Sequence, residues 1–244
     1  MKPFPRILVA VCLWLGVVQM VSAETSGWVS DYNRLLGKYV TANGVRYSEW
    51  KKSPADLKAL QTVVDEIAQE KISSLGSKEQ LAFYINAYNA WILHEALEKY
   101  PTSSVKDLLF TFFTSKRIKV AGQQTSFNSL EKETIRGKFS NPNVHFALNC
   151  ASRSCPPLNR EAFDAGKLDA QFDRLSTAFV NSEKGVRLSV DGKTAELSQI
   201  FDWYKDDFKD GGPVAFINKR RSKPIPDGAK ISYQKYNWSL NEVK

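Results

Sequence analysis

The residues best suited to chemistry lie in one stretch, residues 145–158, which reads HFALNCASRSCPPL. It contains His145, one of only 2 histidines in the chain, together with Cys150 and Cys155. An apolar run leads into a loop of small and polar residues that ends at two prolines. This pattern is typical of a buried element that delivers side chains to a surface loop. We therefore take the stretch as the candidate site.

A thiol mechanism is one interpretation of these residues. Cys150 would be the nucleophile, and His145 would be the base that holds it as a thiolate. Cys150 is the better nucleophile because it lies where the apolar run opens into the loop, whereas Cys155 precedes two prolines. The five-residue separation places His145 and Cys150 on opposite faces of a strand, or about 140° apart on a helix. The pairing therefore needs a bend near Asn149.

A structural disulfide is the competing interpretation. Cys150 and Cys155 would close a small ring, which the loop-closure formula values at about 2 kcal/mol. The ring would fix the shape of the loop and present Arg153 and Ser154 as binding residues. The sequence does not decide between these two states of the cysteines.

Several other kinds of site lack support in the sequence. With only His94 and His145, a histidine-rich metal centre is excluded, and the spacing of the histidines and cysteines follows no common zinc pattern. We therefore predict no metal and no cofactor. The G-x-S-x-G elbow of serine hydrolases is absent. The carboxylates form no convergent pair, so a glycosidase is unsupported.

The N-terminus predicts export. Lys2 and Arg6 precede an apolar run at 7–20, and residues 21–23 (VSA) resemble a small-x-small cleavage site. We expect residues 1–23 to be a signal peptide and the mature protein to be periplasmic or secreted. A membrane anchor needs about 20 apolar residues, and none follows, so no transmembrane anchor is expected after cleavage. Export favours the disulfide, because disulfides persist in oxidising compartments.

The basic charge of the chain does not point to a particular partner. The formal net charge of +8 is spread along the sequence, and the one dense cluster lies at 219–223. No aromatic ladder or glycine-rich phosphate loop accompanies that cluster, so we interpret it as a solvated face. An exported protein seldom meets nucleic acid, so we predict no nucleic-acid partner. The expected partner is a small molecule or a protein.

A central helix is the element most clearly predicted outside the 145–158 stretch. Ser77 to Gln80 forms a capping-box pattern, and Pro101 should end the helix, which gives it a range of about 77–100. Its apolar residues point in almost every direction, as in a buried helix. Asn86 and Asn89 share one face of it, and a buried amide without a partner costs about 1–3 kcal/mol. We expect these amides to bond the 145–158 loop. In the thiol mechanism, Asn86 or Asn89 would orient the imidazole or bind an oxyanion.

Patterns along the remaining chain predict a single helix-rich α+β domain at 26–242, with a small, mostly antiparallel sheet around the buried central helix. Helical spacing and caps predict helices over 28–40, 54–69, 104–113, 128–137, 165–181, 200–208 and 214–217. Alternation and turn residues predict strands or hairpins over 45–50, 117–126, 186–197 and 230–236. The Asp191-Gly192 pair predicts a type I′ turn.

Four blocks of the sequence resemble the domain-of-unknown-function family 547. They lie at 81–90, 145–158, 197–208 and 236–241, and the resemblance spans roughly 45–241. Two positions depart from the family pattern: Asn149 replaces an apolar or variable residue, and Asn237 replaces a common Asp. Candidate positions that fall inside the family motifs are Asn86, Asn89, His145, Cys150, Arg153 and Cys155.

The resemblance implies no particular reaction. Bacterial members of the family resemble exported single-domain proteins, and plant members attach the domain to a predicted coiled coil, which favours an interaction role. Two functions therefore remain open for a pocket formed by the central helix and the 145–158 loop. One is a Cys–His thiol-dependent hydrolase or acyl transferase. The other is a non-enzymatic ligand- or protein-binding module whose recognition loop is stapled by a Cys150–Cys155 disulfide.

Overall fold

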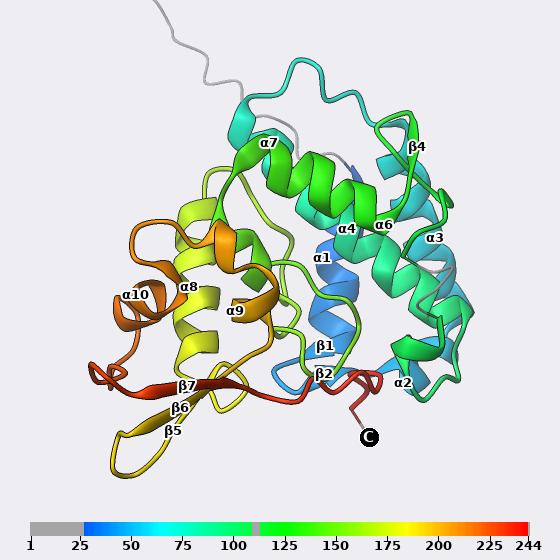
Figure 1. Ribbon diagram of the computed structural model, residues 1–244. Helices are drawn as coiled ribbons and strands as arrows, with labels where there is room; N and C mark the ends of the chain where they lie inside the picture. Colours follow the sequence, from blue (N-terminus) through cyan, green and yellow to red (C-terminus); the bar gives the residue numbers. More distant parts are fainter. Residues whose placement is uncertain (1–26, 109–112, 244) are drawn as a thin grey trace, which may run out of the picture.

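Helices dominate the computed structural model, which describes residues 27–108 and 113–243 (Figure 1). In this part of the chain, short strands form three separate small sheets, so the α+β prediction is confirmed. The predicted signal peptide and part of the helix predicted over 104–113 lie outside the described residues. Within these residues, no helix is both long and apolar enough to cross a membrane.

Helix α4 (Ser77–Glu98) is the predicted central helix, and residues on all of its faces are buried. It packs against α3 (Pro54–Gln69) and against the π-helical segment η2 (Leu130–Arg136). Because neighbouring elements cover α4 on several sides, its apolar residues are not confined to one face of the helix. Its cap lies one residue earlier than predicted, where the Gly76 N–H donates to the carboxylate of Glu79 at 2.6 Å.

The N-terminal part surrounds α4 with further helices and corrects one prediction. Helix α1 (Gly27–Tyr39) packs on α3, and β1 (Val40–Thr41) pairs antiparallel with β2 (Gly44–Val45). The strand predicted over 45–50 ends at Val45, and helix α2 (Tyr47–Lys51) follows it. Tyr47 and Trp50 are both fully buried. Their separation of three residues places both side chains on one face of a helical turn, whereas a strand would direct them to opposite faces.

The middle of the chain contains a hairpin and an interrupted helix. Strands β3 (Ile118–Val120) and β4 (Gln123–Thr125) pair antiparallel, as predicted. After the short 3-10 helix η1 (Val105–Leu108) and this hairpin, α6 (Phe127–Ser129), η2 and α7 (Gly137–Phe139) follow one another without a break. A π-helical insertion of this kind is frequent at functional sites.

The C-terminal part builds the largest sheet. It contains the 3-10 helix η3 (Pro142–Phe146), α8 (Leu168–Val180), β5 (Val186–Leu188), β6 (Thr194–Leu197), α9 (Ile200–Trp203), the 3-10 helix η4 (Lys205–Asp207), α10 (Gly212–Asn218) and β7 (Lys230–Tyr233). Strand β6 pairs antiparallel with β5 and parallel with β7. The prediction of a type I′ turn at Asp191-Gly192 is wrong. A type I′ turn needs a positive φ at both residues, but only Gly192 has one, of 72°.

The 145–158 stretch lies where two apolar clusters meet. Val144 and Ala147 belong to the larger cluster around α1, α3 and α4, whereas Phe146 belongs to a smaller one with Phe179, Phe201 and Phe216. Successive residues of η3 therefore face different cores, and this fixes the orientation of His145 between them.

The C-terminal segment runs back across the molecule from β7 to the β1–β2 hairpin (Figure 1). Its backbone pairs with the candidate loop, where Asn241 donates to Ala151 at 2.9 Å and Arg153 donates to Ser239 at 2.9 Å. It also pairs with Val45, which donates to Asn241 at 2.9 Å. The end of the chain therefore holds the candidate loop in place.

The two asparagines of α4 have definite partners, but only one of them bonds the candidate loop. Asn89 donates to the Ala147 carbonyl at 2.9 Å and accepts from the Asn149 N–H at 3.0 Å. Asn86 makes the same pair of bonds with the backbone of Phe163, each at 2.8 Å. The expected contact between α4 and the loop is thus confirmed for Asn89.

Replacing Asn89 with Ala should destabilise the protein by about 2–4 kcal/mol, because it leaves a buried carbonyl and a buried N–H unpaired. Asn86→Ala removes an equivalent pair of bonds elsewhere and is the matched control. Chemical denaturation should give similar losses for both variants. Only Asn89→Ala should increase hydrogen exchange of the 147–155 amides. Equal protection of that loop in both variants would contradict this assignment.

Candidate functional site

Asn149 organises the turn between the two cysteines. Its side-chain amide donates to the Pro156 carbonyl at 2.8 Å, and its side-chain oxygen accepts from the Ala151 N–H at 2.8 Å. The same oxygen accepts from Asn241 at 3.2 Å. Ala151 has a left-handed backbone with φ 62°. The chain therefore turns sharply at Ala151, directly after Cys150. The bend between His145 and Cys150 that would pair these two residues stays a prediction.

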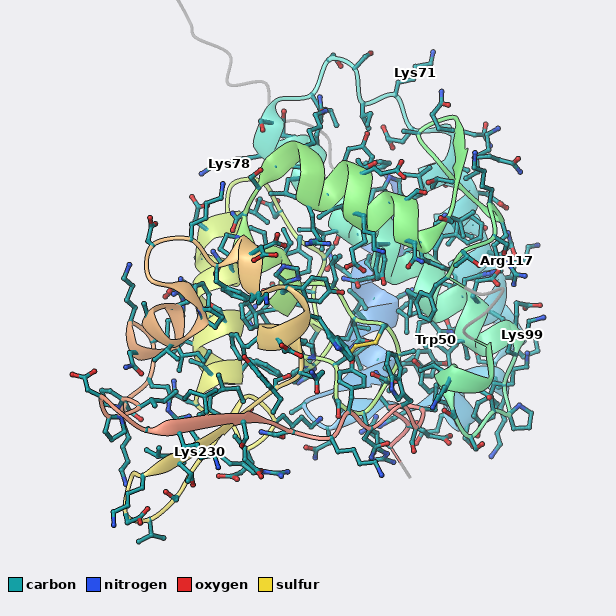
Figure 2. All side chains as sticks on the ribbon, in the orientation of Figure 1. Trp50, Lys71, Lys78, Lys99, Arg117 and Lys230 are labelled. Carbon is teal, nitrogen blue, oxygen red and sulfur yellow. A yellow bond between two sulfur atoms is a disulfide. The ribbon has the colours of Figure 1, made fainter. Side chains whose placement is uncertain are left out.

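The sulfurs of Cys150 and Cys155 lie at disulfide distance, with their Cα atoms 6.3 Å apart (Figure 2, yellow bond). The Tyr236 hydroxyl donates to the Cys155 sulfur at 3.2 Å and accepts from Ser152 at 2.9 Å. Burial raises the pKa of Tyr236 to about 12, so its phenol keeps its proton at neutral pH. The side chain of Tyr236 and the cysteine pair are therefore in contact and together form one wall of a cavity.

This wall borders a cavity of about 250 Å³. Residues of α4, the candidate loop, η2, α9 and the C-terminal segment line it together. Its aromatic lining residues are Tyr88, Phe113, Trp203, Tyr204, Tyr236 and Trp238. Three of these rings pack together, with Tyr236 lying 4.5 Å from Trp238 and 4.8 Å from Trp203 between ring centroids. Trp203 keeps 46% of its surface exposed. The cavity is thus an aromatic site with polar groups at a few positions.

His145 lines the cavity and is held by a carboxylate from η4. Its Nε2 lies 2.7 Å from an oxygen of Asp207, whose carboxylate also accepts two hydrogen bonds from Arg136, at 2.7 and 3.1 Å. Burial acts to raise the pKa of Asp207, but Arg136 and His145 outweigh it and the pKa is lowered. Because Asp207 is ionised, Nε2 must carry the proton, and the basic nitrogen of a neutral imidazole is Nδ1.

The imidazole is neutral at physiological pH. Burial lowers the pKa of His145 from 6.5 to about 4, although Asp207 acts in the opposite direction. The ring stacks on Tyr204 with 4.1 Å between centroids, and the guanidinium of Arg136 lies 4.7 Å from the centroid of Tyr204. His145 therefore contributes a buried, uncharged imidazole to the lining of the cavity.

Among the described residues that line this cavity, Glu131 is the one carboxylate. It lies on η2 and accepts a hydrogen bond from Tyr204 at 2.8 Å. Burial raises its pKa, and the Tyr204 hydroxyl, Arg136 and Lys132 offset only part of that effect. Burial also raises the pKa of Tyr88 and of Tyr204, so both phenols stay protonated and can donate. Glu131 is thus the main polar group for a bound molecule.

The structure brings some of the predicted site residues together and separates others. His145, Cys150 and Cys155 line the aromatic cavity. Asn86 bonds Phe163 with both ends of its amide, so neither end is directed to His145. Arg153 and Ser154 line a different hollow with basic walls. Among the described residues, no group of His, Cys, Asp or Glu has the arrangement of a metal site.

Sequence reasoning missed Glu131, Tyr204, Asp207 and Tyr236. The last three lie inside the blocks at 197–208 and 236–241, which carried the family resemblance, so their block membership was the available signal. No sequence signal pointed to Glu131, because a carboxylate in the first turn of a predicted helix is expected to cap that helix.

The fold and the cavity define a helix-rich α+β protein with an aromatic site closed by a cysteine pair. The family model described as "Protein of unknown function, DUF547" matches residues 72–180, which confirms the resemblance over the central helix and the candidate loop. The blocks at 197–208 and 236–241 lie beyond the matched residues. No curated protein and no solved structure matched the chain.

The neutral state of His145 predicts a pH dependence of stability. Between pH 6.5 and about 4, the unfolded chain binds a proton at this side chain that the folded chain does not. The free energy of unfolding should therefore fall as the pH falls through this window, by roughly 3 kcal/mol at most. The variant His145→Gln keeps a donor for Asp207 but cannot titrate. Urea unfolding of both proteins from pH 7 to 4 should show a steeper loss for the wild type, and parallel curves would contradict the neutral imidazole.

Proposed function

We propose that the protein is a binding module that takes up a small, largely apolar molecule in the aromatic cavity. The observation that carries the proposal is the cysteine pair in the cavity wall, since sulfurs paired with each other offer no thiolate. Pairing also gives the recognition loop one fixed shape, which lowers the entropy lost on binding.

The lining residues support a ligand with a flat apolar part and one polar group. Ring stacking on exposed Trp203 and its neighbours contributes about 0.5–1.5 kcal/mol per pair beyond burial. The Glu131 carboxylate and the tyrosine hydroxyls that line the cavity supply hydrogen-bonding groups for the polar part of the ligand. The cavity volume of about 250 Å³ lies just below the range of drug-sized sites, which suits a molecule built on a single ring.

Export is part of the same proposal. An oxidising compartment, periplasmic or extracellular, would keep Cys150 and Cys155 paired, whereas cytosolic reductants would open the pair. The N-terminal sequence supports this compartment through its basic start, apolar run and small-x-small site.

A thiol-dependent hydrolase or acyl transferase is the second candidate, and one observation favours it. Cys150 and His145 line the same cavity, while Asp207 holds the imidazole through Nε2 and leaves Nδ1 as its basic nitrogen. A base oriented by a carboxylate beside a nucleophile is the general arrangement of nucleophilic catalysis. After a thiol reductant has opened the pair, the Cys150 thiol would give its proton to Nδ1 of His145 and attack an acyl carbon. The imidazolium would return that proton to the departing alcohol, amine or thiol, and the acyl group would then pass from Cys150 to water or to another acceptor.

The binding proposal predicts saturable calorimetric titrations with benzyl alcohol, benzylamine or indole as probes. Trp203→Ala removes the exposed ring and should weaken binding about tenfold. Tyr233→Ala is the matched control, because it removes an exposed ring that does not line the cavity. Glu131→Gln should weaken benzylamine more than benzyl alcohol. Failure of all three probes to bind, or equal affinity in Trp203→Ala and wild type, would contradict the proposal.

The two candidate functions differ in the state of Cys150. The protein, isolated from its own compartment, should give no iodoacetamide adduct at Cys150 or Cys155 by mass spectrometry until a reductant is added. The variant Cys150→Ser/Cys155→Ser should keep probe binding, because the cavity supplies the contacts. A single reactive thiol at Cys150 without reductant, silenced by His145→Ala, would instead establish the thiol mechanism and overturn the binding module.

A further inference from the structure

A second hollow, of about 350 Å³, adjoins the aromatic cavity and differs from it in charge. It shares Tyr236 with the cavity, and its basic lining residues are Arg153, Lys184, Arg187 and Lys235. Among the described residues that line it, none carries a carboxylate side chain. We call this hollow the basic groove.

The positive charge of the basic groove is only partly balanced. Arg187 lies 3.7 Å from a carboxylate oxygen of Glu183 and 3.5 Å from one of Glu196. Among the described residues, no carboxylate forms an ion pair with Arg153, Lys184 or Lys235. Burial lowers the pKa of Lys184, and the charge of Arg153 lowers it further. Like charges this close repel each other unless an anion lies between them.

Neutral contacts hold the groove in shape. A guanidinium nitrogen of Arg153 donates to the Glu242 carbonyl at 2.9 Å, which positions the side chain without supplying a countercharge. The Ser154 hydroxyl accepts from the Asn237 N–H at 2.8 Å. On the opposite wall, the Gln234 amide donates to the carbonyls of Glu183 and Glu196, at 3.0 and 3.2 Å. The backbone around the groove is therefore tied together from segments far apart in the sequence.

We propose that the basic groove is a binding site for a phosphate or sulfate group. Arg153 offers a planar donor fork, and Lys184 and Lys235 offer ammonium donors, a combination that suits tetrahedral oxyanions. The Ser154 hydroxyl and the side chains of Gln199 and Asn237 supply neutral polar groups at the same place. The site is distinct from the aromatic cavity, and it is independent of whether that cavity binds a ligand.

The position of Tyr236 adds a geometric consequence. Because this residue lines both hollows, an oxyanion in the groove would lie next to the wall of the aromatic cavity. A free phosphate or sulfate and the headgroup of an anionic lipid present the same chemistry to the groove. The experiment therefore needs one probe for each source.

The test uses the variant Lys184→Gln/Lys235→Gln, which removes two exposed charges from the groove. The control Lys52→Gln/Lys71→Gln removes two exposed charges that do not line it, and Lys71 lies at the opposite end of the molecule from β5–β7 (Figure 2). Thermal unfolding checks that all the proteins fold alike. Arg153→Gln provides a second groove variant that keeps a donor for the Glu242 carbonyl.

Calorimetry with inorganic phosphate and with sulfate measures the free anion, and co-sedimentation with phosphatidylglycerol vesicles measures the headgroup. With at least one probe, the wild type and the control should bind alike, and both groove variants should bind about tenfold more weakly or worse. Binding of that probe should also weaken as salt is added. Absence of binding to all the probes, or equal losses in groove and control variants, would overturn the proposal. Either result leaves the test of the aromatic cavity unaffected, because its probes carry no anion.

Discussion

Asn89 donates one hydrogen bond to the loop that carries the paired cysteines and accepts another from it, and these two bonds, on which the site depends, join that loop to the central helix. The donor and acceptor on the loop are backbone groups in the interior, where losing a partner costs about 1–3 kcal/mol each. Asn149 continues the network by bonding the two arms of the turn to each other and to the C-terminal segment. These hydrogen bonds therefore hold the loop in addition to the cysteine pair.

A second network controls the electrostatics of the cavity. Arg136 neutralises Asp207, Asp207 holds Nε2 of His145, and the imidazole lies flat against Tyr204. The imidazole is therefore neutral, because burying a charged imidazolium at this position would cost free energy. Glu131, which accepts a hydrogen bond from Tyr204, is subject to the same desolvation, which raises its pKa. The described lining of the aromatic cavity thus combines a neutral imidazole with one carboxylate, whereas the basic groove on the other side of Tyr236 has four cationic side chains. The contrast between the two hollows gives each its own ligand chemistry.

Much of this arrangement could be predicted from local sequence. The central helix was predictable because Leu81 to Leu93 is apolar on every side, and the need of Asn89 for a partner follows from its burial there. The strand predicted in place of helix α2 came from the alternation of Val45 and Tyr47, which Trp50 does not continue. Trp50 instead lies on the same face of a helical turn as Tyr47 and stacks on Tyr39, 4.4 Å away. The pairing of His145 with Asp207 joins residues 62 positions apart. The sequence around each carboxylate does not indicate which of them lies in the site. Arg153 and Ser154 were correctly seen as polar residues of the loop, but only the fold shows that they face the basic groove.

The central claim is that the aromatic cavity binds a small apolar molecule while its cysteines stay paired. Fluorine NMR of the oxidised protein, labelled with 5-fluorotryptophan and titrated with benzyl alcohol, tests it most directly. Because Trp203 and Trp238 line the cavity, their signals should shift in a saturable way. The signal of the buried Trp50 should not change. Unchanged Trp203 and Trp238 signals, or shifts that arise only after the cysteine pair is reduced, would contradict it.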